Sequence, residues 1–131
     1  CEVNGLIMAW CNEEGGGPEW EIPVLPEVGD DEWTEFERHE WVIPTHNIEM
    51  GEIQVDTAHF QYLHGVADMP ESTVTIDGPT MHARSETQMI TPQGNITSII
   101  DSKSWGFGFQ RTKFSGITDM MIGRRKCSYA F

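Results

Sequence analysis

The stretch that decides the interpretation of this 131-residue chain reads Asp56-Thr57-Ala58-His59-Phe60-Gln61-Tyr62-Leu63-His64. It brings one carboxylate and two imidazoles together within nine positions. Imidazole suits iron, zinc and copper, and two histidines with one carboxylate and open positions form a common protein site for non-haem Fe(II). The stretch therefore predicts a site for a single iron ion.

The spacing of the two histidines constrains how they share a metal. In a regular α-helix each residue turns by about 100°, so Asp56 and His59 share a face while His59 and His64 point about 140° apart. We therefore expect the helix either to end just after His59, with His64 on the following turn, or to carry a π-bulge. Gly65 is compatible with a helix stop. His59 and His64 are then the ligands, and Asp56 accepts the second N–H of the His59 ring.

Two other interpretations of this stretch stay open. In the first, His59 and His64 are unrelated histidines of an amphipathic segment, and Phe60, Tyr62 and Leu63 belong to the core. In the second, the two histidines bind zinc in a hydrolase. That enzyme would need an acid near the metal as general base, and the His-Glu-x-x-His motif that supplies one is absent.

The rest of the chain predicts one helix followed by a meander of strands. The helix is expected at residues 49–63, with Asn47 as N-cap, after a strand at 35–44. Residues 68–79 have the composition of a loop. Later strands are expected at 81–91, 95–103, 106–114 and 117–131, joined by turns at Pro92-Gln93-Gly94 and Ser115-Gly116. This order is an α+β arrangement.

Composition excludes two classes of partner. The chain has 8 Lys and Arg against 21 Asp and Glu, a net charge of −13, which argues against nucleic acid and against an anionic membrane surface. No apolar run is long enough for a membrane span, and nothing resembles a signal peptide. The odd count of three cysteines favours a reducing, cytoplasmic compartment.

The segment from Glu52 to Gly65 resembles the Glu-Asn-x-x-Asp-x-x-His-Phe-x-x-x-His signature of the catalytic subunits of Rieske non-haem iron oxygenases. Residues 3–10 resemble the last strand of their Rieske domain, and residues 23–26 resemble the proline-bearing connector after it. Residues 29–34 are nearest to the ketosteroid 9α-hydroxylase and cholesterol 7-desaturase branch. The chain departs from the signature at Ile53, where the family usually has Asn, so a contact made by that amide is missing.

The resemblance implies a fold and a domain division. Residues 1–28 would be the end of a Rieske domain and its connector, and residues 29–131 the N-terminal part of a catalytic domain. That domain would be a partial helix-grip (START-like) fold, with a curved antiparallel sheet enclosing an apolar pocket above the iron. Candidate pocket residues are Phe60, Tyr62, Met81, Met89, Trp105, Phe107, Phe109 and Phe114. We interpret the chain as an internal fragment.

The resemblance also implies an activity. A reductase or ferredoxin would pass electrons to a [2Fe–2S] Rieske cluster and on to mononuclear Fe(II), which uses O₂ to hydroxylate or desaturate a bulky apolar, steroid-like or aromatic substrate. Asp56 would bridge toward a cluster histidine from the neighbouring subunit of a homotrimer. The cluster ligands, Cys-x-His and Cys-x-x-His, do not occur in the chain.

Two questions remain open under this interpretation. The third iron ligand, an Asp in the family, should lie beyond Phe131; Asp101 and Asp119 are substitutes that no motif supports, and neither is assigned. The acidic residues between Glu13 and Glu40 form either a solvated surface or a docking face for the electron donor. The alternative function is a helix-grip lipid- or steroid-binding module without catalytic iron.

Overall fold

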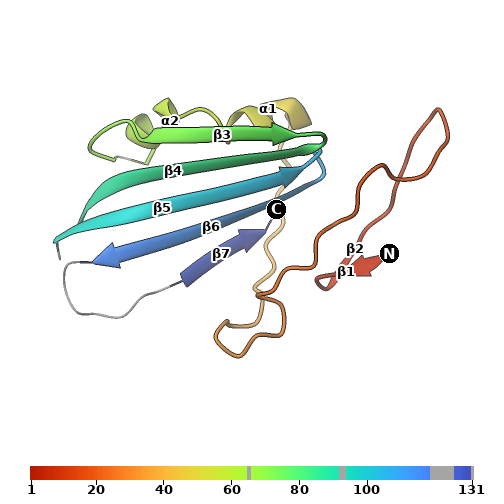
Figure 1. The fold of residues 1–131 in the computed structure, drawn as a ribbon, viewed down its shortest axis with the longest axis horizontal. Helices are drawn as coiled ribbons and strands as arrows, with labels where there is room; N and C mark the ends of the chain where they lie inside the picture. The colour runs from red at the N-terminus through yellow and green to blue at the C-terminus, as the bar shows by residue number, and fades with distance from the viewer. Residues whose placement is uncertain (65, 92–93, 119–125, 131) are drawn as a thin grey trace. The chain divides into compact units, whose positions relative to one another are not determined.

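The computed structural model describes residues 1–64, 66–91, 94–118 and 126–130 (Figure 1). The chain divides into two compact units, Cys1–Ile43 and Pro44–Phe131. The predicted division into a Rieske end and a catalytic domain stays a prediction. Within the described ranges, the first unit contains β1 (Glu2–Val3) and β2 (Leu6–Ile7), and the second contains α1 (Asn47–Glu52), α2 (Ala58–Tyr62), β3 (Glu71–Asp77), β4 (Thr80–Thr91), β5 (Gly94–Trp105), β6 (Phe109–Thr118) and β7 (Lys126–Ala130).

The first unit is organised around a small hairpin. Strands β1 and β2 are antiparallel, and Asn4 and Gly5 between them both have positive φ, 55° and 72°, as a tight hairpin loop requires. The Asn4 amide donates to the Pro23 carbonyl at 2.8 Å, and its side-chain oxygen accepts from the Leu25 backbone N–H at 2.8 Å. Asn4 therefore ties the hairpin to the proline-bearing segment, in which Leu25 is buried.

The strand expected at residues 35–44 is wrong. Residues 35–43 belong to neither helix nor strand, and their side chains are exposed. A strand needs a neighbour to take its backbone N–H and C=O groups, and none of the described strands pairs with this segment. Its charges meet locally instead, as in the contact between Arg38 and Glu40.

The second unit is built on an antiparallel meander in the order β3-β4-β5-β6-β7 (Figure 1). The expectation of a mostly antiparallel sheet with little helix is confirmed. Residues 68–79, expected as loop, instead contain strand β3, because the run Ser72-Thr73-Val74-Thr75-Ile76 is rich in β-branched side chains. Gly78 and Pro79 then form a two-residue loop into β4, since Asp77 pairs with Thr80.

A second correction concerns the turn expected at Ser115-Gly116, between the strands expected at 106–114 and 117–131. Ser115 and Gly116 lie inside β6 and pair with Ile99 and Ser98. Gly106, expected to begin a strand, instead has a φ of 57° and begins the loop between Trp105 and Phe109 that joins β5 to β6. The Gly106 N–H donates to the Pro79 carbonyl at 2.8 Å, so the two hairpin loops at this end of the sheet are joined.

The single helix expected at residues 49–63 is two short helices. Helix α1 is capped by His46, whose ring Nδ1 accepts from the Ile48 N–H at 3.2 Å, and not by Asn47. After Glu52 the backbone hydrogen bonds are those of turns, and the helix does not continue. A new helix begins at Ala58.

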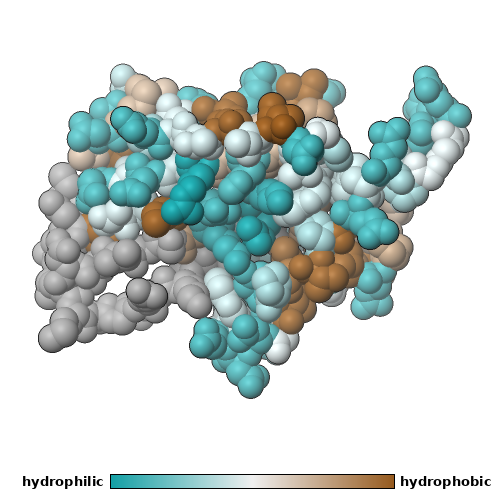
Figure 2. All heavy atoms as spheres, in the orientation of Figure 1, coloured by the Kyte–Doolittle hydropathy of each residue, from teal (hydrophilic) through white to brown (hydrophobic). Residues whose placement is uncertain are grey.

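The two faces of the sheet differ in chemistry. One face carries buried small polar side chains, and we call it the hydroxyl face: Ser85, Thr87, Ser98, Ser102, Ser104 and Thr112. The other, the charged face, carries His82, Arg84, Asp101, Lys103 and Arg111 on β4, β5 and β6. Figure 2 shows a mainly hydrophilic centre on the side of the sheet toward the viewer, with hydrophobic residues near the helices.

Gly78→Ala should lower the free energy of unfolding by about 1 to 2 kcal/mol, because Gly78 has a φ of 53° and a left-handed backbone is costly for an L-residue. Nothing lies within 4 Å of a Cβ at this position, so the cost is conformational. Gly108→Ala is the matched control, since its surroundings are also open and its φ is not in the left-handed range. Urea midpoints measure both, and equal losses would contradict the assignment.

Candidate metal centre

Helix α2 sets the relation between the two candidate histidines. His59 is its second residue, and the helix ends at Tyr62, before His64. The His59 carbonyl accepts from the Leu63 N–H at 2.7 Å and from the His64 N–H at 3.4 Å. The second bond spans five residues, as in a π-type turn. The widened last turn replaces the regular helical spacing that would have set the two side chains about 140° apart.

The two imidazole rings lie close together. Their centroids are 5.4 Å apart, and the rings meet edge to face at 72°. Two imidazoles bound to one metal through nitrogen at about 2.1 Å have centroids roughly 5 Å apart. The observed centroid separation is close to this value, and the assignment of the two histidines as ligands stays a prediction.

The His59 ring is held in one orientation by Asp56. Its Nδ1 atom contacts the backbone carbonyl of Asp56, while the nearer carboxylate oxygen lies 3.9 Å away. The expectation that the Asp56 side chain takes this bond is corrected, because the main-chain oxygen makes the shorter contact. A carbonyl can only accept, so Nδ1 donates, and Nε2 is left as the ring nitrogen with a free lone pair.

The Asp56 carboxylate starts helix α2. Its Oδ1 atom accepts from the Ala58 N–H at 2.9 Å, which satisfies one of the donors at the beginning of the helix. Thr57, the residue just before the helix, makes no side-chain capping bond. The side chain of Asp56 is about half exposed, so its second oxygen faces surroundings that a further partner can reach.

Phe60 packs against both histidines. Its ring centroid lies 4.2 Å from that of His59 and 6.1 Å from that of His64. The Phe60 carbonyl accepts from the Val66 N–H at 3.2 Å, and this hydrogen bond connects the residue after the motif to helix α2. Tyr62 is 85% exposed, so its expected place in an enclosed pocket is not observed.

A third ligand is not brought to the two histidines within the described ranges. Over those ranges, no group of three His, Cys, Asp or Glu side chains is placed to hold a metal. Asp101, one of the two substitutes, is committed elsewhere: its carboxylate lies 3.2 Å from His82, 3.6 Å from Arg84 and 3.5 Å from Arg111. Asp119 lies outside the described residues. Among the described residues, His59 and His64 are thus two of the three ligands that the iron prediction requires.

Gln54 is a residue that the sequence gave no reason to select. It lies between α1 and α2, is 7% exposed, and neither polar atom of its amide has a hydrogen-bond partner. Ile53, which replaces the family's usual Asn, is 51% exposed. A buried amide without hydrogen-bond partners costs free energy of folding. The sequence does not predict this burial, which is seen only in the folded chain.

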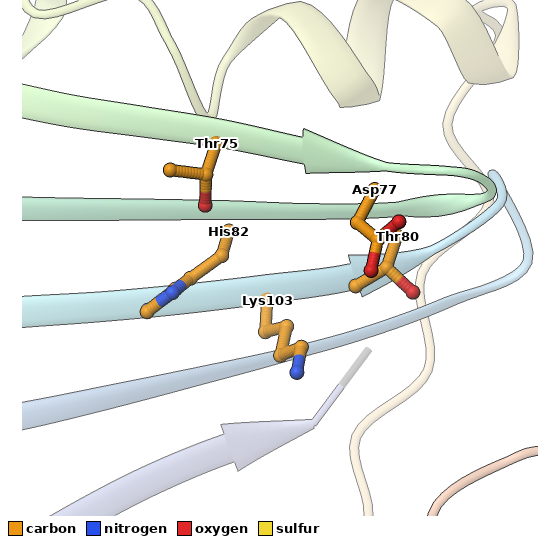
Figure 3. A pocket seen from close by; sticks show the side chains of 5 residues that line it. All are labelled: Thr75, Asp77, Thr80, His82 and Lys103. Atoms are coloured by element: carbon orange, nitrogen blue, oxygen red, sulfur yellow. The ribbon is translucent and has the colours of Figure 1, made fainter.

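The expected aromatic pocket is not assembled by its described members. Phe109 is buried, whereas Phe107 is 66% exposed, and its ring lies against Gly51 of α1. The side chain of Met89 is outside the described set. A shallow hollow of about 190 Å³ lies instead on the charged face, lined by Thr75, Asp77, Thr80, His82 and Lys103 (Figure 3). Its lining is polar, so it is not the predicted apolar pocket.

The comparisons place this chain in a family. The family model described as the 3-ketosteroid 9alpha-hydroxylase C-terminal domain matches residues 9–124. The chain therefore belongs to this family, in the ketosteroid 9α-hydroxylase and cholesterol 7-desaturase branch of the Rieske oxygenases, as the motif predicted. No solved structure was found to match it.

Individual relatives agree with this assignment. Cholesterol 7-desaturase of Caenorhabditis elegans is 31% identical over 116 residues, 88% of this chain and 25% of that protein. Cholesterol 7-desaturase of Xenopus laevis is 34% identical over 64 residues, 49% of this chain and 14% of that protein. The 3-ketosteroid-9-alpha-monooxygenase oxygenase component of Mycobacterium tuberculosis is 34% identical over 64 residues, 47% of this chain and 17% of that protein. The chain thus spans a quarter or less of these relatives.

Cys1 and Cys11 are free and exposed, and the side chain of Cys127 lies outside the described set. None of the helices in the described ranges is both long enough and apolar enough to cross a bilayer.

Asp56→Ala should lower the free energy of unfolding by about 1 kcal/mol, because α2 loses its side-chain cap. Asp56→Asn should cost much less, since an asparagine oxygen caps a helix nearly as well as a carboxylate. Chemical denaturation of the two variants beside the parent chain measures the difference. Equal losses would show that the carboxylate charge, and not the capping bond, stabilises this region.

The 131-residue chain should bind Fe(II) weakly, because only two imidazoles of the described part converge. Anaerobic titration with Fe(II) followed by desalting should leave little bound iron, and His59→Ala should remove what remains. Tight binding of one iron per chain would show that an acid of this chain completes the site. Asp119→Ala would then be the first variant to examine.

Proposed function

We propose that this chain forms part of the catalytic domain of a Rieske-type oxygenase that hydroxylates or desaturates a bulky apolar, steroid-like or aromatic substrate. The observation that carries the proposal is the pair of imidazoles 5.4 Å apart at the end of α2, within a chain of this family. The steroid names of the relatives support the substrate class. The helix-grip architecture of the complete domain is part of the same proposal.

His59 and His64 are proposed to bind the iron. The contact of His59 Nδ1 with the Asp56 carbonyl fixes the ring and directs Nε2 to the metal, as supporting hydrogen bonds do in metal sites. His64 approaches from the widened turn and is exposed, whereas Phe60 packs against one side of the His59 ring. Fe(II) bound there would supply the activation of O₂. The third ligand is proposed to be an Asp outside the described residues.

Asp56 is proposed to connect the iron site to its electron source. Its Oδ1 caps α2, and Oδ2 lies 3.9 Å from His59 Nδ1 on a half-exposed side chain. This arrangement leaves the carboxylate able to accept a hydrogen bond from a histidine of a [2Fe–2S] cluster in a neighbouring subunit. A reductase or ferredoxin as donor and a homotrimer as assembly belong to this proposal.

In the complete gene product that contains this chain, Asp56→Asn should keep the iron but slow electron transfer, because the cap survives while the linking charge is lost. His59→Ala should weaken iron binding by more than about 100-fold, since loss of a ligand exceeds the about 10- to 100-fold effect of losing its supporting partner. The assay is iron content together with single-turnover oxidation of the pre-reduced cluster on adding substrate and O₂.

The control is His39→Ala, which removes an exposed histidine of the first unit and should change neither readout. If Asp56→Asn oxidises its cluster as fast as the parent, Asp56 only caps the helix. If the parent binds steroid but no iron, the chain belongs to a binding module without catalytic iron, and the proposed enzyme is wrong.

A further inference from the structure

The hydroxyl face is unusual for the buried side of a sheet. Such a face is normally apolar where it meets the core, yet Ser85, Thr87, Ser98, Ser102 and Thr112 are all at most 7% exposed. A buried hydroxyl costs free energy unless it forms a hydrogen bond. The small side chains also leave more room above the strands than Leu, Ile or Phe would.

Most of these hydroxyls satisfy one another across the strands. The Ser72 hydroxyl contacts that of Ser85. The Ser102 and Thr112 hydroxyls are 3.0 Å apart, and the Gln110 amide donates to them at 3.1 Å and 3.2 Å. These hydroxyls therefore form two separate hydrogen-bonded groups, one between β3 and β4 and one between β5 and β6.

Thr87 differs from its neighbours. It is 5% exposed, and its Oγ1 atom has no hydrogen-bond partner. On the same face its neighbour along the strand is Ser85, and its partner across the strands is Ser98. Ile100, next to Ser98 on this face, is also buried. Thr87 therefore has a desolvated hydroxyl without a partner between two serines and an apolar side chain, which is the condition of a group kept for a ligand or a bound water.

Thr87 lies at the end of the sheet that receives the chain from the metal centre. Strand β3 begins at Glu71, opposite Glu86 of β4, so Thr87 lies one step beyond this first pair. Glu71 follows His64 by seven positions. Figure 1 shows α2 at the same end of the sheet as the start of β3. The unpaired hydroxyl and the imidazole pair are thus at one end of the second unit.

We infer that Thr87, with Ser85 and Ser98 beside it, forms a polar subsite that hydrogen-bonds an oxygen substituent, hydroxyl or keto, of an otherwise apolar ligand. The inference rests on the proposed function and adds that recognition is not purely hydrophobic. A threonine hydroxyl both donates and accepts, so it matches either substituent.

The test compares two probes that differ by one oxygen, cholesterol and the hydrocarbon cholest-5-ene, by equilibrium binding to the complete gene product. A net hydrogen bond of about 1 kcal/mol corresponds to about a fivefold preference for cholesterol. Thr87→Val keeps the shape of the side chain and should abolish that preference by weakening only cholesterol binding. Thr87→Ser should retain it, because the hydroxyl remains.

Thr97→Val is the matched control, because Thr97 is adjacent to Ser98, lies on the opposite face, and its hydroxyl already accepts from Gln88 at 2.9 Å. It should leave the preference unchanged. An undiminished preference in Thr87→Val, or equal weakening of both probes, would overturn the inference and point to a structural water. Iron content measured on the same samples separates this result from failure of the proposed enzyme, which would show as absent iron.

Discussion

The hydrogen bond between the Asp56 carboxylate and the Ala58 N–H is the interaction on which the candidate site depends. It starts a new helix after a break of five residues that follows α1, so the motif does not lie on one continuous helix. Because α2 is short, His64 falls beyond its end, and the His59 carbonyl accepts two N–H groups. The cap, the short helix and the widened turn together bring the two imidazoles close to each other.

The sheet contributes by separating two kinds of chemistry. Asp101 lies among His82, Arg84 and Arg111, so basic side chains of β4 and β6 gather around one carboxylate of β5 on this face. The opposite face is left to hydroxyls that bond mostly among themselves, with Thr87 as the exception. A one-residue shift of register would exchange these faces, and hairpin loops such as Gly78-Pro79 prevent it.

The sequence predicts the meander and the family well, because alternating strands and the spacing from Asp56 to His64 are local signals. It fails where the outcome depends on competition or on distant partners. Ser115-Gly116 has the composition of a turn, but its pairing with Ile99 and Ser98 keeps it inside β6. Ile53 and Val55 weaken a long helix, but the cap at Asp56 is needed to break it. The burial of Gln54 and the ion pairs of Asp101 depend on residues that are distant in the sequence, so no local sequence pattern predicts them.

The brevity of α2 has a thermodynamic consequence. A helix of five residues has no independent stability in water, so the free energy that orders this segment comes from its cap, from Phe60 and from whatever binds the imidazoles. Metal affinity and local folding are then linked quantities, and part of the intrinsic binding energy is spent on ordering the ligands. Substitutions that tighten the turn without touching a ligand atom should therefore raise affinity, which makes metal occupancy a sensitive report of local order in this region.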